Sequence, residues 1–183
     1  MISYKITYVA KFKLVAGVYL EIYCLCHNME KVPDNKKEII SAELLQAAHV
    51  WAEGKSQEIL QAGEALREDE FALAKEVGVL QPEQVKILEV DEIPSLEDEV
   101  LIEIADQVGL SFSRSKGMAL GYGIYIVKGY RSARLVSHEL RHVFQYEDAG
   151  SLQEFLKRYI AELQTYGYQD APLEIDAKNH EIS

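Results

Sequence analysis

The sequence predicts an α+β fold, mostly helical, with a small sheet beside a helix that carries an H-E-x-x-H motif. Three observations lead to this prediction. Several segments after residue 38 space their apolar residues as a helix does, two short segments are rich in β-branched and aromatic residues, and the motif at residues 138–142 lies in a helical pattern. The predicted order is helices, a strand, a helix, a strand and then helices to the end, which is typical of an α+β domain.

The length, composition and charge of the chain limit the classes of protein to which it can belong. The chain has 183 residues, 48% of them hydrophobic and 27% charged, which fits one domain with an attached arm and a core that needs no disulfide. Thirty acidic and nineteen basic residues give a net charge of -11. Such a surface repels a phosphate backbone, so no nucleic-acid partner is expected.

Residues 1–35 are predicted to form an amino-terminal arm, and residues 36–183 a separate domain. Apolar and polar residues alternate along residues 2–14, as in a half-buried strand or hairpin, and the polar stretch at residues 28–37 is predicted to be a linker. Charged residues interrupt the apolar stretch at residues 6–26, and no small-residue cleavage site follows it. No membrane span or signal peptide is therefore expected, and a cytoplasmic location is predicted.

Two cysteines and a histidine, Cys24, Cys26 and His27, lie together near the end of this arm. They could form a second metal site, or the cysteines could be reduced thiols without a metal. The second interpretation is favoured because no further pair of soft ligands follows at the spacing of a zinc finger.

The segment between the linker and the motif is predicted to form three helical stretches, the first of which is one helix or two, and two strands. Glycines close the second and third helices, at Gly78 and Gly109, and Pro94 ends the first strand. Within the second strand, Gly121 and Gly123 either allow a substrate backbone to approach closely or mark a bulge or twist. The predicted helices are residues 39–66, 66–77 and 97–108, and the predicted strands are residues 85–90 and 118–127.

The H-E-x-x-H motif supplies the candidate chemistry. A spacing of four residues places His138 and His142 one above the other on a helix, so both imidazoles can reach one tetrahedral ion. Glu139 lies about 100° round the helix from His138, near enough to face a water molecule without binding the metal, and is the predicted general base. The opposite face of the helix is apolar and is expected to pack on the core.

A third metal ligand must come from another part of the fold. Gly150 is predicted to end the motif helix. Ser151 is predicted to cap the next helix, which packs on the core and stops at Gly167. Asp170 is predicted to cap a further helix that begins near Pro172. This return of the chain brings Glu174 back beside the motif, so Glu174 is the preferred third ligand. Asp176 is expected to orient a ligand histidine through its other ring nitrogen. The alternative ligands are Glu147, Glu162 and His180.

The same segments resemble the compact core of the gluzincin metallopeptidases, in which a glutamate on a later helix completes a zinc site of two histidines and one glutamate. The matching features are the strand-like segment GMALGYGIYIV, the helix with HELRH, an intervening helix and the segment APLEIDA. The chain is also similar to small bacterial proteins with an H-E-L-x-H-x-x-Q-Y pattern and a later A-P-L-E-x-x-A segment. The resemblance covers residues 118–178 well and residues 40–117 loosely.

This resemblance implies one zinc ion held by His138, His142 and Glu174, with Glu139 as base. Gluzincins place an acidic residue four positions after the ligand glutamate, where this chain has Lys178, so the orienting role passes to Asp176. The candidate residues for stabilising an oxyanion are Tyr122, Tyr125, Tyr166 and Tyr168.

The function expected from these features is zinc-dependent hydrolysis of a peptide or protein substrate, with water activated by the metal and by Glu139. In enzymes resembling this chain, the substrate lies antiparallel along a strand beside the motif helix. Two other interpretations stay open. One is a catalytically silent, zincin-like domain that binds metal and acts through protein interaction, and the other is a helical scaffold without metal.

Overall fold

The computed structural model describes residues 10–14, 18–22, 42–96, 99–107 and 114–183. The chain divides into two compact units, Met1–Lys36 and Lys37–Ser183. In the first unit, β1 (Ala10–Leu14) and β2 (Val18–Ile22) form an antiparallel pair in which Ala10 lies opposite Ile22. The part of the alternating pattern that the structure describes, residues 10–14, thus forms one strand of a hairpin. The expected linker and the cluster of Cys24, Cys26 and His27 lie outside the described residues.

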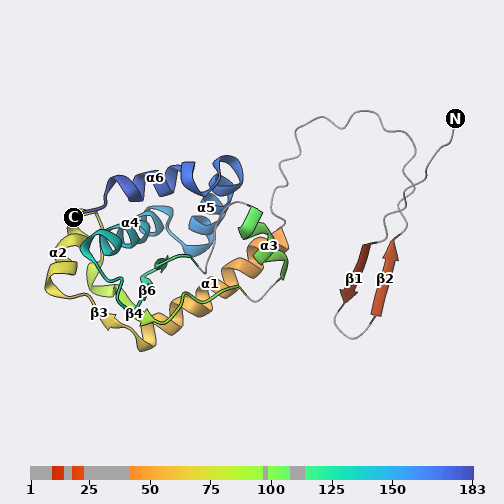
Figure 1. The fold of residues 1–183 in the computed structure, drawn as a ribbon, viewed down its shortest axis with the longest axis horizontal. Helices are drawn as coiled ribbons and strands as arrows, with labels where there is room; N and C mark the ends of the chain where they lie inside the picture. The colour runs from red at the N-terminus through yellow and green to blue at the C-terminus, as the bar shows by residue number, and fades with distance from the viewer. Residues whose placement is uncertain (1–9, 15–17, 23–41, 97–98, 108–113) are drawn as a thin grey trace. The chain divides into compact units, whose positions relative to one another are not determined.

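The second unit confirms the predicted fold class: it is α+β, mostly helical, with one small mixed sheet. Figure 1 shows its elements in chain order. The helices are α1 (Ala42–Ala62), α2 (Glu68–Glu76), α3 (Glu99–Gln107), α4 (Ala133–Ala149), α5 (Leu152–Tyr166) and α6 (Pro172–Asn179), with short 3-10 turns η1 (Pro82–Gln84) and η2 (Tyr168–Asp170). The strands are β3 (Glu64–Ala65), β4 (Lys86–Val90), β5 (Gly117–Leu120) and β6 (Gly123–Val127).

The sheet has the order β3-β4-β6-β5, which places β5 at one edge. Strands β4 and β6 run parallel, whereas β3 and β5 each pair antiparallel with their neighbours. Every residue of β6 is buried, as expected for a central strand covered on both faces. The edge position of β5 matters below, because this strand borders the candidate site.

The single strand predicted at residues 118–127 is wrong, because these residues form two strands joined by a tight turn. Gly121 occupies the turn with a φ of +63°, a conformation that side-chain-bearing residues rarely adopt. At Gly123, an added Cβ would lie 2.9 Å from Cβ and Cδ1 of Ile59 on α1. The close approach at this glycine is therefore that of a packed helix.

Helices cover both faces of the sheet, and the alternation along β6 explains how. Ile124 and Ile126 pack in a core with residues of α2 and α4, whereas Tyr125 and Val127 pack in a second core with residues of α1 and α5. Successive side chains of a strand point to opposite faces, so the run of apolar residues serves both layers. The candidate site lies where these two helical layers meet at the β5 edge.

Helix α6 runs alongside α4 (Figure 1) and is fixed there by polar contacts. The prediction that Asp170 caps this helix is wrong: Asp170 lies in η2, and Ala171 is the N-cap, followed by Pro172 in the first turn. Proline suits this position because its missing N–H would have no helical partner. Arg141 of α4 donates from Nε to Oδ2 of Asp176 at 2.7 Å and so holds α6 in place.

A buried ion pair joins the start of α4 to α2 and the sheet. Arg131 Nε and Nη2 donate to Oε1 and Oε2 of Glu70 at 2.7 and 2.8 Å, and Nη1 donates to Oε1 of Glu89 at 3.1 Å. The Arg131 and Glu70 side chains are each only 5% exposed. This two-point contact fixes the end of α4 from which the motif follows.

None of the described helices combines the length and the apolar character needed to cross a bilayer.

Candidate metal centre

Helix α4 presents the motif residues from a well-defined frame. Ser132 caps its first turn by accepting a hydrogen bond from Leu135 N–H, and Gly150 ends it in the left-handed conformation, as predicted. Its hydrophobic face, which includes Val136, Leu140 and Val143, is buried in the core. The other face carries His138, Glu139 and His142, the last two of which are buried.

Glu174 reaches the two histidines from α6. Its Oε2 lies 3.5 Å from Nε2 of His138, and its Oε1 lies 3.4 Å from Nε2 of His142. The three donor atoms all lie within 4.8 Å of one another, so the group could hold a metal ion. The structure thus brings together His138, His142 and Glu174, which are 36 residues apart at most.

The spacing of these donors fits a metal ligand set better than a set of direct hydrogen bonds. Strong N–H···O bonds have donor–acceptor distances of about 2.7–3.2 Å, shorter than the two observed distances. Two ligand atoms that each lie about 2.0–2.1 Å from a tetrahedral ion are separated by about 3.3–3.4 Å. The observed 3.4 and 3.5 Å lie close to this separation, with each histidine facing a different oxygen of Glu174, and one ligand atom from each of the three residues lies within 4.8 Å of the others.

The three alternative ligands lie in other contacts. The carboxylate of Glu147 accepts hydrogen bonds from the N–H groups of Leu80 and Gln81, at 2.7 and 2.9 Å. Glu162 accepts a hydrogen bond from Leu173 N–H at 2.8 Å, and His180 Nδ1 lies 2.7 Å from the carbonyl oxygen of Asp176. These side chains therefore organise the fold around the site.

Glu174 is held as an anion. Burial alone would raise the pKa of this carboxyl, but its polar contacts with His138, His142 and Tyr159 outweigh burial and set the pKa well below its usual range. Tyr159 OH donates to Glu174 Oε1 at 2.6 Å. For His142, burial would lower the pKa, but the nearby Glu174 raises it to about 9. The negative charge of Glu174 can therefore be neutralised by the His142 imidazolium, or by a metal ion whose binding releases the His142 proton.

The prediction that Asp176 holds a ring nitrogen of a ligand histidine is wrong, because Gln145 takes that position. Gln145 Oε1 lies 2.8 Å from Nδ1 of His142. Gln145 Nε2 donates to Asp176 Oδ2 at 2.8 Å and to the carbonyl oxygen of Leu173 at 3.0 Å. Both Nε2 partners are acceptors, so the amide oxygen faces the imidazole and Nδ1 of His142 is the donor.

This arrangement leaves Nε2 of His142 free to bind a metal, and Asp176 acts on the histidine only through Gln145. The sequence contained a signal for Gln145. It lies three residues after His142, a spacing that places both side chains on one face of a helix.

His138 has a different outer contact. Its Nδ1 is buried and has no hydrogen-bond partner among the described residues, but it lies 3.3 Å from Oε1 of Glu181, which also pairs with Arg134. The distance is within range of an ion pair, although the angle is not that of a hydrogen bond. Glu181 lies after α6 in the chain, where helical periodicity gave no reason to connect it with the motif.

Glu139 faces β5, and this contact depends on a residue without a side chain. A Cβ added at Gly117 would lie 2.7 Å from Cδ and 2.8 Å from Cγ of Glu139, so any larger residue would displace the carboxyl group. Burial raises the pKa of Glu139, and the negative charge of Glu174 raises it further. His138, His142 and a hydrogen bond from the backbone of Ala119 act in the opposite direction, but the net shift of the pKa is upward. A raised pKa suits a carboxylate that takes up a proton near neutral pH.

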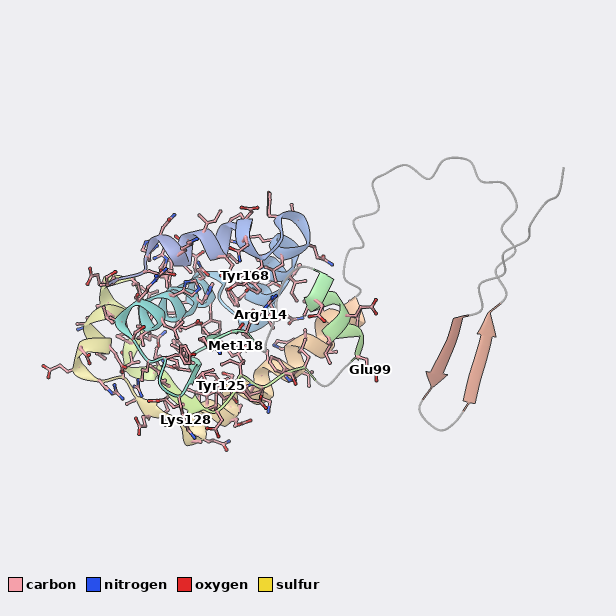
Figure 2. All side chains as sticks on the ribbon, in the orientation of Figure 1. Glu99, Arg114, Met118, Tyr125, Lys128 and Tyr168 are labelled. Atoms are coloured by element: carbon pink, nitrogen blue, oxygen red, sulfur yellow. The ribbon has the colours of Figure 1, made fainter. Side chains whose placement is uncertain are left out.

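A cavity of about 150 Å³ adjoins the donor group and Glu139. Among the four candidate tyrosines, Tyr168 lines this cavity together with Glu139 and Glu174. Burial, Glu174 and Glu139 raise its pKa, so the hydroxyl keeps its proton. Figure 2 labels Tyr168 and also Met118, which lines the cavity from β5.

The other three tyrosines have different surroundings. Tyr122 packs edge-on against Tyr146, with ring centroids 5.2 Å apart. Tyr125 OH lies 3.5 Å from the carbonyl oxygen of Lys55. Tyr166 is 54% exposed. Tyr168 is therefore the candidate that the structure favours for contact with a bound substrate.

Comparisons with models of protein families, with curated proteins and with solved structures found no match for this chain. The chemistry assigned to the site therefore rests on its donor atoms, their distances and their burial.

Proposed function

We propose that this protein is a zinc-dependent peptidase of the gluzincin type. The observation that supports this proposal most directly is the convergence of His138, His142 and Glu174, whose ligand atoms all lie within 4.8 Å of one another, beside Glu139. Two imidazole nitrogens and one carboxylate oxygen form a typical catalytic zinc donor set, and a structural zinc site would be expected to have four protein ligands.

The residues around the donor set fit hydrolysis of a carbonyl compound. When bound, zinc supplies a Lewis acid that polarises a carbonyl group and lowers the pKa of water. Glu139, fixed beside Gly117 and hydrogen-bonded to the backbone of Ala119, takes the proton from the attacking water as general base. Tyr168 keeps its proton and can donate to the oxyanion that develops on the former carbonyl.

The edge strand β5 supports a peptide as the substrate. Within the described sheet, β5 pairs with β6 on one side only, and residues of β5 line the cavity beside Glu139. An unpaired strand edge can bind an extended peptide through main-chain hydrogen bonds. A peptide bound in this way would pass beside the carboxylate that activates water.

The decisive experiment combines metal analysis with hydrolysis. Protein purified without chelators should contain about one zinc per chain, and it should cleave a mixed peptide library in a chelator-sensitive manner. Glu139→Gln should keep the zinc and lose cleavage, because the side chain acts as base and is not a ligand.

Other outcomes of this experiment identify the competing functions. Zinc bound without cleavage in the unmodified protein would favour a silent metal-binding domain that acts through protein interaction. Metal-free protein that folds normally in chelator would contradict both functions. Loss of zinc in Glu139→Gln would show that the assigned roles are wrong.

A further inference from the structure

The cavity beside the donor group is larger and more apolar than activation of water requires. It lies between α1, α3, β5 and α5, in the region where the two helical layers meet. The donor group and Glu139 lie on one wall. Six of the side chains that form the remainder are Trp51, Met118, Leu120, Phe155, Leu156 and Ile160.

The size of the cavity selects the size of its occupant. Its volume is about 150 Å³. An engineered protein cavity of the same volume, lined by leucine, isoleucine and phenylalanine, stays free of water and binds benzene. A benzene-sized group has the bulk of a phenylalanine or leucine side chain, so one such side chain would fill the space.

The chemistry of the walls selects an apolar occupant. Among the described residues that line the cavity, the charged or titratable side chains are His138, Glu139, His142 and Glu174, together with the tyrosines beside Glu174. The remaining walls offer no charge to pair with a lysine or an aspartate. Burying an unpaired charge there would cost far more than burying an apolar group gains.

We propose that this cavity is the specificity pocket of the site and takes one phenylalanine- or leucine-sized side chain of a peptide, next to the bond that is cleaved. This inference rests on the proposed peptidase function. It adds the substrate class: peptides with a large apolar residue at one fixed position beside the scissile bond.

Small residues on α1 and α3 create the space. Ala48 and Ala52 lie four residues apart and so share one face of α1, and both line the cavity, as does Ala105 of α3. Leucine at position 48 would extend into the volume that the substrate side chain needs. Ala48→Leu is thus a pocket-filling variant, and it touches none of the donor residues.

The test measures kcat/KM for four peptides that differ only at the position next to the cleaved bond, which carries phenylalanine, leucine, alanine or lysine. The unmodified protein should prefer phenylalanine or leucine over alanine by about 10-fold to 200-fold, since even one methylene group changes discrimination by such factors, and it should reject lysine. Ala48→Leu should reduce the preference for phenylalanine over alanine by at least about tenfold, with zinc content unchanged. Val50→Leu is the control, because Val50 lies on the same helix and is 60% exposed.

Failure of this inference differs from failure of the peptidase function. Chelator-sensitive cleavage without preference among the four peptides, or with the same preference in Ala48→Leu, would overturn the pocket and leave the peptidase intact. If zinc and cleavage are both missing, the peptidase function fails.

In that case, NMR titration with N-acetyl-phenylalanine amide tests the pocket by itself. Shifts at the cavity residues in the unmodified protein and their loss in Ala48→Leu would support an apolar side-chain site. Unchanged spectra would overturn it.

Discussion

At the scale of single residues, Gly117 controls the position of the proposed base. Gly117→Ala places a methyl group 2.7 Å from Cδ and 2.8 Å from Cγ of Glu139, closer than such atoms can approach, so the carboxyl group must move. A misplacement of about 1 Å can cost about 100-fold in rate, and we expect a loss of that size in kcat. Zinc content should not change, because Glu139 is not a ligand. Gly54→Ala is the matched control, since an added Cβ at Gly54 meets nothing within 4 Å. A Gly117→Ala protein with normal kcat would contradict the assigned role of Glu139.

Measurements of zinc affinity can distinguish the role of Glu174 as a metal ligand from the role of its neighbour Asp176. Glu174→Ala leaves two histidines as ligands, whereas Asp176→Ala removes a partner of Gln145 and Arg141 and leaves the ligand set whole. Loss of an outer partner typically weakens metal binding by about 10-fold to 100-fold, so Glu174→Ala should exceed that range and Asp176→Ala should not. Titration with zinc against a competing chelator gives both values. Equal losses would remove Glu174 from the ligand set.

Gln145 should control the tautomer of His142. Gln145→Leu keeps a side chain at this position but removes the acceptor of the Nδ1 proton, so we expect zinc affinity to fall by about 10-fold to 100-fold. Nitrogen NMR of the metal-free protein at a pH above the pKa of His142, where the imidazole is neutral, should show the Nδ1–H form in the unmodified chain and a mixture of tautomers in the variant. Zinc affinity lost with an unchanged tautomer would mean that Gln145 acts only by packing.

At the scale of elements, the helices and helix ends that depend on residues close together in the chain could be predicted from the sequence. The helix with the motif, the stop at Gly150, the cap at Ser151 and the stop at Gly167 all follow from short-range patterns, and the structure confirms them. The strand at residues 118–127 was mispredicted because a run of β-branched and aromatic residues does not reveal the turn at Gly121. Gln145 lies at a local spacing from His142, but the contacts that orient its amide, with Leu173 and Asp176, come from another helix and could not be predicted.

The ion pair between Arg131 and Glu70 is a contact between elements, and we expect it to stabilise the fold at neutral pH. Breaking a buried pair leaves an unpaired charge and typically costs about 3–5 kcal/mol, so Arg131→Ala should lower the free energy of unfolding by about that amount. Urea denaturation measures the change. Lys128→Ala is the control, because the pair of Lys128 with Asp91 is largely exposed and should contribute little.

The same ion pair predicts a dependence of stability on pH. Burial would raise the pKa of Glu70, but the hydrogen bonds from Arg131 and from Arg67 N–H outweigh burial and lower it. A carboxyl whose pKa is lower in the folded state contributes stability above its unfolded pKa of about 4.3 and loses that contribution as pH falls through the folded value. Acid should therefore reduce the difference in unfolding free energy between the unmodified protein and Glu70→Gln. A difference that stays constant below about pH 4 would contradict this account.

At the scale of the whole molecule, the candidate site joins parts of the chain that the sequence does not connect. His138 and His142 could be paired from spacing alone, and Glu174 from the expected return of the chain. The cavity could not be predicted, because its apolar walls come from α1, α3, β5 and α5, whose apolar residues have the same pattern as ordinary core residues. The position of β5 beside Glu139 likewise depends on strand order, which a sequence pattern does not specify.

Metal binding at this site should stabilise the whole second unit, because the ligands tie α6 to α4. A ligand that binds only the folded state adds about 4 kcal/mol when its free concentration is 1,000 times its Kd. A domain of this size changes its Tm by about 2–4 °C per kcal/mol, so buffered zinc at that concentration should raise Tm by about 8–16 °C. Chelator should reverse the rise, and magnesium should not produce it, because magnesium prefers six oxygen ligands. Glu174→Ala should lose most of the rise at the same zinc concentration. An equal rise in the variant would show that zinc stabilises the fold at another place.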